Sequence, residues 1–434
     1  MRVIAFYLPQ FHPVPENDLW WGKGFTDWRN VAKARPNFVG HYQPHIPSDL
    51  GFYDLRVPET REVQAELARA YGIDGFCYHH YWFNGRRLLE RPFEEVLRTG
   101  RPDMPFCLCW ANENWTRRWD GDEQEILIAQ THSAYDDRAF IQSLFPAFED
   151  RRYICIDGRP LLVVYRVNLL PDPKATAEIW REECHRRGFP GVHLCAAQSF
   201  GITDPRPYGF DSALEFPPHG VFSRRMNPWL RVVNRRYEGS IYDYREVILN
   251  SIRSKDPDYC LFRAVMPAWD NTARRQNGSN CFVNISPEKY EFWLASAIAR
   301  TRSRFDGDLQ LVFINAWNEW GEGCHLEPDM RYGHQFLAAT ERAKRNAVLT
   351  GACCGLRLPI EWDDGMNDPS ASEVTRFLAS QPEKIFLVDY RMISFAASPP
   401  TLSERWIMRL KRMRGNGGAD GWHSLFKQVL RRWT

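Results

Sequence analysis

Short apolar runs alternate with segments of helical periodicity along most of this chain, and this alternation limits the possible folds more than any other feature. Eight runs are rich in Val, Ile, Phe, Tyr and Cys, the composition expected of buried strands. These runs are Arg2–Pro9, Asp74–Trp82, Pro105–Ala111, Leu161–Arg166, Val192–Gln198, Ala213–Pro217, Leu261–Trp269 and Leu311–Trp317. Eight strands with helices between them predict an α/β fold, the (β/α)8 TIM barrel.

Seven segments between or after the runs have the apolar spacing of helices that cover a sheet. They are Pro58–Tyr71, Arg87–Arg98, Tyr135–Phe148, Ala175–Arg187, Tyr242–Arg253, Pro287–Arg302 and Arg331–Ala347. Ser286 is expected to cap the helix that starts at Pro287. A doubly wound open sheet is the alternative fold, but no Gly-x-Gly-x-x-Gly or P-loop motif follows any of the strands.

The character of the chain changes after the predicted barrel, which we expect to occupy residues 1–350. Residues 351–402 are expected to form an accessory extension packed on the barrel. In residues 403–434, eight basic residues stand against two acidic ones, beside apolar residues at helical spacing. Such a C-terminal extension predicts a basic amphipathic tail, typical of a helix on an anionic membrane surface. A solvated helix packed on the barrel is the alternative, and both stay open.

Charge and cysteine usage narrow the partners and the compartment. The chain has 56 Lys and Arg against 54 Asp and Glu, a net charge of +2, which argues against nucleic acid as a partner. The eleven cysteines are scattered, mostly inside apolar runs, as buried thiols are. We find no signal-peptide pattern and no apolar stretch long enough to span a bilayer. We therefore expect a cytoplasmic protein, with peripheral contact to the inner face of the cell membrane if the tail binds lipid.

The ends of the predicted strands are crowded with polar and aromatic side chains that are poor core residues. In a (β/α)8 barrel the active site lies at the C-terminal ends of the strands. Aromatic residues make up 14% of the chain, and exposed indoles in loops are good platforms for sugar faces. The predicted substrate-binding residues are Tyr7, Gln10, His12, Trp20, Trp21, Trp28, His45, His79, His80, Trp82, Trp110, Asn112, Glu113, Asn114, Trp115, Trp269, Trp317, Asn318 and Trp320. Asp27 is a further candidate to bond sugar hydroxyls.

Two carboxylates three residues apart, Glu319 and Glu322, follow the eighth strand among tryptophans and glycines. Cleavage of a glycosidic bond needs two carboxyl groups, one to protonate the leaving oxygen and one to assist attack at the anomeric carbon. A neighbouring indole can desolvate one carboxyl and raise its pKa. We therefore predict Glu319 and Glu322 as the catalytic pair. Two loop carboxylates in salt bridges are the alternative, and Glu113 is a rival catalytic acid.

The spacing of the candidate ligands does not indicate a metal or cofactor site. His41, His45, His79 and His80 lack the spacing of a His-Glu-x-x-His motif. Asp120-Gly121-Asp122 matches the Asp-x-Asp pattern that holds a metal in many nucleotide-sugar transferases, but it is also a good turn. We predict no metal and no cofactor.

Several long motifs resemble one known family. They are Tyr7–Pro13, Trp20–Trp28, His41–His45, Tyr81–Gly85, Cys109–Trp119 and Trp317–Asp329. In this order they resemble the WbsX-type proteins, which are related to glycoside hydrolase family 99, the endo-α-mannosidase type. The resemblance covers about residues 1–347, and it implies a (β/α)8 barrel that acts on glycans without a metal.

The resemblance also implies roles for the glutamates. Glu319 matches the family 99 residue that deprotonates the substrate's own 2-hydroxyl, which then displaces the leaving group through a 1,2-anhydro sugar. Glu322 matches the general acid, which later acts as the base. The Trp20–Trp28 and His41–His45 blocks belong to the WbsX group and not to the mannosidases, so mannose specificity is not implied.

Two functions of different kinds follow. The first is a retaining glycoside hydrolase or transglycosylase on a bacterial surface polysaccharide or its lipid-linked oligosaccharide precursor. The alternative is a glycosyltransferase of O-antigen, lipopolysaccharide or other polysaccharide biosynthesis, since WbsX-type proteins are often named so from the functions they accompany. A barrel that binds glycans without turnover is a third possibility.

Overall fold

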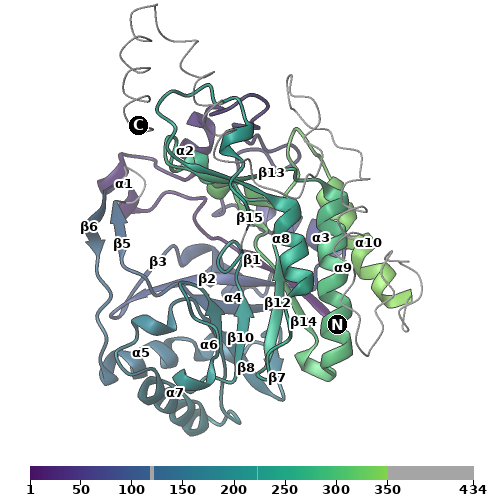
Figure 1. The fold of residues 1–434 in the computed structure, drawn as a ribbon. Helices are drawn as coiled ribbons and strands as arrows, with labels where there is room; N and C mark the ends of the chain where they lie inside the picture. The colour runs from purple at the N-terminus through teal and green to yellow at the C-terminus, as the bar shows by residue number, and fades with distance from the viewer. Residues whose placement is uncertain (118–121, 222, 350–434) are drawn as a thin grey trace, which may run out of the picture. The chain divides into compact units, whose positions relative to one another are not determined.

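A closed barrel of eight parallel strands forms the centre of the computed structural model, which describes residues 1–117, 122–221 and 223–349 (Figure 1). The strands are β1 (Arg2–Tyr7), β2 (Gly75–Phe83), β4 (Phe106–Trp110), β8 (Arg159–Val164), β9 (His193–Gln198), β10 (Ser212–Glu215), β12 (Leu261–Val265) and β14 (Leu311–Ile314). Each pairs in parallel with its neighbours, and β1 pairs with both β2 and β14, which closes the barrel. The predicted (β/α)8 fold and all eight predicted strands are confirmed.

The strands are buried along nearly their whole length because the barrel interior and the surrounding helices cover both faces. Phe6, Phe216 and Phe313 meet inside, with ring centroids 4.9 Å and 5.8 Å from that of Phe6. Gly75 starts β2 where a side chain could not fit, since a Cβ there would lie 2.8 Å from the Pro105 carbonyl oxygen. The barrel is a filled core, so a ligand can enter only at its ends.

Helices connect most of the strands and pack around the barrel. They are α3 (Pro58–Ala70), α4 (Arg91–Thr99), α5 (Ala134–Ser143), α6 (Phe145–Phe148), α7 (Pro173–Arg187), α8 (Tyr244–Arg253), α9 (Pro287–Arg304) and α10 (Gln335–Leu349). The helix predicted over Tyr135–Phe148 is divided into α5 and α6 at Leu144, because Pro146 cannot donate an amide to a continuing helix. Ser286 accepts a hydrogen bond from the Lys289 amide and caps α9, as predicted.

The connections at the C-terminal ends of the strands are long and carry small elements. These are α1 (Pro15–Trp21), α2 (Trp28–Lys33), the hairpin of β5 (Trp115–Arg117) and β6 (Asp122–Ile128), the pair β11 (Ser240–Asp243) and β13 (Asn280–Val283), and the hairpin of β15 (Asn318–Glu319) and β16 (Cys324–His325). Figure 1 shows α1 beside β5 and β6, and the Trp20 and Trp115 rings lie 5.8 Å apart. The loops therefore build a wall around one end of the barrel.

Two parts of the domain prediction lie outside the described residues: the accessory extension over residues 351–402 and the basic tail over residues 403–434. The last described helix, α10, ends at Leu349, close to the predicted end of the barrel. Within the described part of the chain, no helix combines the length and the apolar composition that a bilayer crossing needs.

Candidate active site

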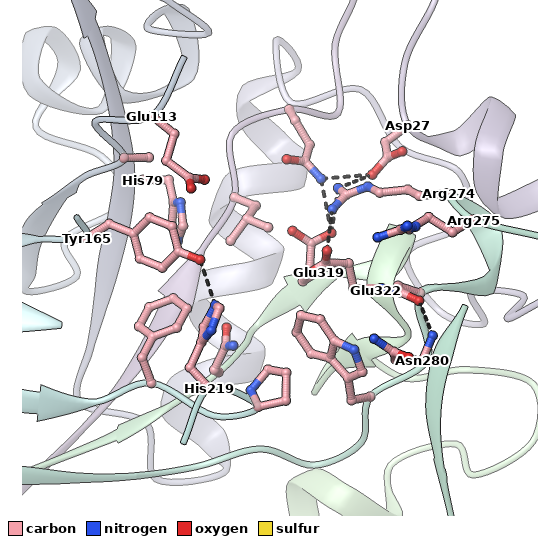
Figure 2. A pocket seen from close by; sticks show the side chains of 18 of the residues that line it. Asp27, His79, Glu113, Tyr165, His219, Arg274, Arg275, Asn280, Glu319 and Glu322 are labelled. Atoms are coloured by element: carbon pink, nitrogen blue, oxygen red, sulfur yellow. Dashed lines mark hydrogen bonds and ion pairs between the residues drawn. The ribbon is translucent and has the colours of Figure 1, made fainter. Parts of the chain in front are cut away.

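A cavity of about 800 Å³ lies at the C-terminal end of the barrel, the end where (β/α)8 enzymes carry their active sites (Figure 2). Its volume falls in the range of ordinary ligand sites. Loops that follow β1, β2, β4, β8, β9, β10, β12 and β14 all contribute to its wall. The predicted pair, Glu319 and Glu322, lies on this wall.

Arg274 ties three carboxylates together on one side of the cavity, called here the charged wall. Its Nη2 lies 2.6 Å from Asp27 Oδ2 and 2.8 Å from Glu319 Oε1, and its Nη1 lies 3.2 Å from Glu322 Oε1. Gln10 Nε2 donates to Asp27 Oδ2 at 2.9 Å and to Glu319 Oε1 at 3.2 Å. Figure 2 shows the Arg274 guanidinium between Asp27 and Glu319.

The Arg274 guanidinium contacts three carboxylates at once, and these contacts change the pKa values of the group. Burial raises the pKa of Glu319 well above the ordinary carboxyl range; Arg274 opposes this rise, whereas the carboxylates of Glu322 and Asp27 add to it. Burial lowers the pKa of Arg274, but the carboxylates outweigh it and hold that pKa above its usual value. The Glu319 carboxyl therefore keeps its proton to a higher pH than an ordinary glutamate does, a property that acid–base catalysis uses.

In the segment around the glutamates, some side chains anchor the backbone in the interior and others line the cavity. Asn318 accepts from the Leu8 amide at 2.8 Å and donates to the Leu8 carbonyl at 3.0 Å, which fastens the segment to the end of β1. Trp320 Nε1 donates to Glu327 at 2.6 Å in the interior. The two glutamates between and after these anchors line the cavity.

Two glycines of this segment, Gly321 and Gly323, lie where a side chain would collide with neighbouring residues. A Cβ on Gly321 would overlap the Asp27 carboxylate and the Arg274 guanidinium. Gly323 has φ +56°, in the left-handed region that favours glycine, and its backbone packs against Asp270. Only glycine between the two glutamates lets the charged wall close around Arg274.

The opposite side of the cavity is aromatic and is called here the aromatic wall, formed by Tyr165, Phe200, Phe216 and His219. The Tyr165 hydroxyl and His219 Nε2 lie 2.8 Å apart, a contact drawn in Figure 2. The rings of Phe200 and His219 are 4.6 Å apart, and those of Tyr165 and Phe216 are 5.0 Å apart. Such ring faces suit the apolar faces of sugars.

Glu113 lies near this aromatic side, beside His79 and Tyr165 and away from Glu319 (Figure 2). Its carboxylate is 2.6 Å from Arg166 Nη1, an ion pair that holds it in place. Burial and, to a lesser extent, Arg274 lower the pKa of His79 to about 4, so this imidazole is neutral at the cavity wall. Glu113 is thus separated from the catalytic pair.

Nine of the predicted site residues line the cavity. They are Gln10, Trp21, His79, Glu113, Asn114, Trp115, Trp269, Glu319 and Glu322. Asp27, predicted to bond sugar hydroxyls, also lines it, but its carboxylate is engaged by Gln10 and Arg274.

Twelve other predicted site residues are not part of the cavity lining. They are Tyr7, His12, Trp20, Trp28, His45, His80, Trp82, Trp110, Asn112, Trp317, Asn318 and Trp320. All except Trp20 are buried, and their contacts explain why strand ends are rich in such groups. Trp28 Nε1 donates to the Tyr53 carbonyl at 2.8 Å, and Trp82 Nε1 donates to Asp136 at 2.9 Å. These two contacts favour a packing role for Trp28 and Trp82, since buried polar groups need internal partners.

Arg274 is the residue that the sequence reasoning missed. It follows the seventh strand, whose exit was read only as far as Trp269. Reading that loop further would have reached Asp270, Asn271 and Arg274, because every strand exit of a barrel converges on the same end. His219, which follows β10, was missed for the same reason, whereas Tyr165 was missed because it lies inside the predicted run Leu161–Arg166 and counts as part of that strand.

Among the residues that the structure describes, two groups have side chains that could hold a metal ion. One consists of His41, Asp270 and Cys281, and the other of His45, His325 and Asp329, each with its ligand atoms within 4.8 Å of one another. The predicted alternative at Asp120-Gly121-Asp122 cannot be placed, since residues 118–121 and the side chain of Asp122 lie outside the described residues.

The fold is shared with carbohydrate-active barrels of known structure. A GH99 endo-α-mannosidase from Bacteroides thetaiotaomicron, in complex with BIS-TRIS-propane, superposes with a TM-score of 0.50 at 16% identity, over 80% of this chain and 98% of that chain. A structure described as a glycoside hydrolase-like protein gives a TM-score of 0.51 at 12% identity, over 79% and 93% of the two chains. At these identities the likeness concerns the fold alone, a (β/α)8 barrel.

The chain belongs to the family described as "Glycosyltransferase WbsX", whose model matches residues 3–340. A relative described as "Uncharacterized protein WxcX", from Xanthomonas campestris pv. campestris (strain B100), is 46% identical over 353 residues. A second WxcX, from strain ATCC 33913, gives the same identity over the same length. These matches cover 81% of this chain but 51% of the relatives, so the chain spans about half the length of the curated relatives it matches. The resemblance that the sequence motifs carry is confirmed.

Proposed function

We propose that this chain is a retaining glycoside hydrolase or transglycosylase that acts on a bacterial surface polysaccharide or its lipid-linked precursor. The observation that carries the proposal is the position of Glu319 and Glu322 on one cavity wall, joined through the same guanidinium. Glycosidic cleavage with retention needs two carboxyl groups of the enzyme that act on the same sugar residue. Glu319 and Glu322 lie close enough to act together in this cavity.

In the proposed first step, Glu319 accepts the proton of the substrate's 2-hydroxyl while that oxygen attacks the anomeric carbon. Glu322 gives its proton to the leaving oxygen, so a 1,2-anhydro sugar and a free sugar hydroxyl result. Glu319 must be ionised for this step, and its raised pKa then makes the carboxylate a stronger base for the hydroxyl proton.

In the second step, Glu322 takes a proton from water or from an acceptor hydroxyl, which opens the three-membered ring at the anomeric carbon. Glu319 returns its proton to the 2-oxygen, and both carboxyls regain their starting states. Arg274 stays bound to both glutamates and limits the repulsion between them. Two inversions at one carbon give retention.

The proposed substrate class rests on the shape and lining of the cavity. The aromatic wall offers ring faces for stacking, and polar side chains such as Gln10, Asn114 and Asn280 stand among the lining residues. Cavities of carbohydrate enzymes need this mixture, because a sugar ring has apolar faces and a polar edge. Water and a second sugar are both possible acceptors.

A nucleotide-sugar glycosyltransferase is the second candidate, and the description of the family favours it. It requires affinity for a sugar nucleotide, which calorimetry with and without manganese would measure. A nucleotide-dependent lengthening of glycans would support this candidate and contradict the hydrolase.

The deciding experiment incubates the full chain with host surface polysaccharide and lipid-linked fragments, without nucleotide sugars, and follows glycan masses. We expect shorter or rearranged products from the wild type and none from Glu319→Gln. Glu113→Gln tests the rival catalytic acid: its carboxylate lines the cavity but is paired with Arg166 away from Glu319, so we expect product formation to persist, with weaker substrate binding. An active Glu319→Gln variant would overturn the assignment of the pair.

A further inference from the structure

Behind the turn that carries Glu322, two histidines and an aspartate from distant parts of the chain meet in the interior. His45 comes from the loop after β1, His325 from β16, and Asp329 from the segment that follows β16. All three are buried, with 8%, 7% and 4% of their surface exposed. We propose that His45, His325 and Asp329 bind one zinc ion, which fastens the catalytic turn to the barrel.

The hydrogen bonds of His325 show which of its nitrogens could bind a metal. Its Nδ1 lies 2.9 Å from the carbonyl oxygen of Glu327, and a carbonyl can only accept, so Nδ1 carries the proton. The lone pair of Nε2 accepts a hydrogen bond from His45 Nδ1 at 2.9 Å, and a zinc ion would take the place of that proton. Metal-binding histidines usually have this arrangement, in which the second ring nitrogen donates to a carbonyl or carboxylate.

The ligand rings are held in place before any ion binds. Trp320 stacks on His325 with centroids 3.7 Å apart and planes 14° from parallel, and Tyr42 stacks on His45 at 4.4 Å. Asp329 Oδ1 accepts from the amides of Arg331 at 3.0 Å and Tyr332 at 2.6 Å, which fixes the carboxylate. Little conformational entropy would be lost on binding, because the side chains are already ordered.

The distances are close to those of a zinc site. His45 Nδ1 and His325 Nε2 lie 2.9 Å apart, and Asp329 Oδ2 lies 4.0 Å from His325 Nε2. Zinc binds imidazole nitrogens and carboxylate oxygens at about 2.0–2.2 Å, so the two nitrogens need to separate only slightly to occupy two tetrahedral positions.

The site also has room for a fourth ligand. A small cavity of about 20 Å³ is lined by His45, Gly323, His325 and Asp329 among others. One water molecule needs about 10–15 Å³ of such space, so a water can complete the coordination.

The proposed ion would stabilise the charged wall without taking part in the chemistry. His45 lies directly behind the turn, since its Cε1 would be 3.2 Å from a Cβ on Gly323. The same loop holds Asp270 through His41 at 2.5 Å, and the Asp270 amide donates to the Glu322 carbonyl at 2.7 Å. A zinc ion between His45 and the 325–329 segment would therefore restrain both sides of Glu322.

The neighbouring group of His41, Asp270 and Cys281 fits zinc less well. Asp270 Oδ2 already binds His41 Nε2 at 2.5 Å and accepts from Gln43 Nε2 at 2.8 Å. Burial raises the pKa of the Cys281 thiol well above its usual value, whereas zinc binds the thiolate. This group serves as the internal control.

The test measures metal content and cobalt spectra of the full chain after chelation and reloading. We expect one zinc ion per chain, a higher melting temperature with zinc, and tetrahedral cobalt bands without a thiolate-to-cobalt charge-transfer band. Asp329→Asn keeps the oxygen that accepts from the Arg331 and Tyr332 amides, so it should fold but lose stoichiometric binding and the thermal shift. His325→Gln should lose both as well.

Two variants separate this proposal from its alternatives. Cys281→Ser should retain the zinc ion and the cobalt spectrum, and Glu319→Gln should retain the zinc ion even though the proposed catalysis fails. The proposal is overturned if the wild type binds no zinc, if Asp329→Asn binds it as tightly as the wild type, or if the cobalt spectrum shows thiolate ligation. None of these outcomes depends on which glycan reaction the protein catalyses.

Discussion

The charged wall and the aromatic wall of the cavity differ in origin, burial and charge. The charged wall comes from loops after β1, β12 and β14, and its central groups are deeply enclosed: the Arg274 and Glu319 side chains are 12% and 8% exposed. The aromatic wall comes from loops after β8, β9 and β10, and its Phe200 is 48% exposed. One wall is therefore built to fix charges, and the other to offer ring faces.

This difference predicts a division of labour. Interactions that are stronger in the transition state than in the ground state raise kcat, whereas uniform binding changes mainly KM. Charges that develop during glycosidic cleavage are felt by Glu319, Glu322 and Arg274, but hardly by neutral rings. Substitutions in the charged wall should therefore lower kcat, and substitutions in the aromatic wall should raise KM.

The largest effect in this comparison is expected for Arg274→Lys. A lysine ammonium cannot contact three carboxylates with the geometry of the guanidinium. We expect kcat/KM to fall by about 100-fold, which is the loss of rate expected when catalytic groups are displaced from their working positions. Lysine keeps the positive charge but loses the contacts of the guanidinium with Glu319, so its opposition to the raised pKa of Glu319 should weaken, and activity that needs ionised Glu319 would then begin at higher pH. A pH profile of kcat/KM measures this shift.

Arg275→Lys is the control for that experiment. Arg275 is the next residue, is more exposed and also lines the cavity, but Glu319 has its ion pair with Arg274. The acidic limb of the pH profile of kcat/KM for Arg275→Lys should coincide with that of the wild type. Equal shifts in both variants would mean that the general positive charge of the loop, and not the contacts of Arg274, sets the profile.

A smaller effect, on KM, is expected for the aromatic wall. Phe200→Ala removes a half-exposed ring that packs against His219 and lies under the Arg166 guanidinium at 3.7 Å. We expect KM to rise about tenfold with little change in kcat, as for the loss of an aromatic contact of about 1–1.5 kcal/mol. Tyr135→Ala removes an exposed ring away from the cavity lining and should leave both constants unchanged. A fall in kcat for Phe200→Ala would break the proposed division.

Much of the barrel could be predicted from the sequence because strands buried on both faces are continuous apolar runs. All eight such runs became barrel strands, and the pair Glu319 and Glu322 was found because a strand exit in this fold leads to the active site. The divided helix at Leu144 was not foreseen, although Pro146 was visible in the sequence.

The partners of the glutamates could not be predicted in the same way. Arg274 lies 45 residues from Glu319 and Asp27 lies 247 residues from Arg274, so only the closed barrel brings them together. Trp110 and Trp320 looked like sugar platforms because composition does not reveal which way an indole points. Trp110 instead stacks on Phe140 at 4.2 Å, and Trp320 stacks on His325.

The smallest expected effect concerns the support behind the charged wall. Glu327 lies under Trp320 and accepts hydrogen bonds from Trp320 Nε1 at 2.6 Å, from the Tyr53 hydroxyl at 2.7 Å and from Gln64 Nε2 at 2.6 Å. Burial raises the pKa of Glu327 from its usual value of 4.5 to about 7, and the three hydrogen bonds only partly oppose this rise. The charged wall therefore packs against a group whose pKa lies near neutrality.

The sign of the resulting pH dependence follows from the two pKa values. Below pH 4.5 the carboxyl is protonated in both the folded and the unfolded chain, and its contribution to stability is fully present. As the pH rises through the folded pKa of about 7, that contribution is lost, by an amount on the order of 3 kcal/mol. Glu327→Gln cannot ionise, so its melting temperature should fall less than that of the wild type between about pH 5 and 8. The variant should be less stable at low pH, because its amide places a donor against one of the three donors. Parallel melting curves across this range would show that Glu327 does not titrate there, and that the turn behind Glu319 and Glu322 keeps its stability independently of pH.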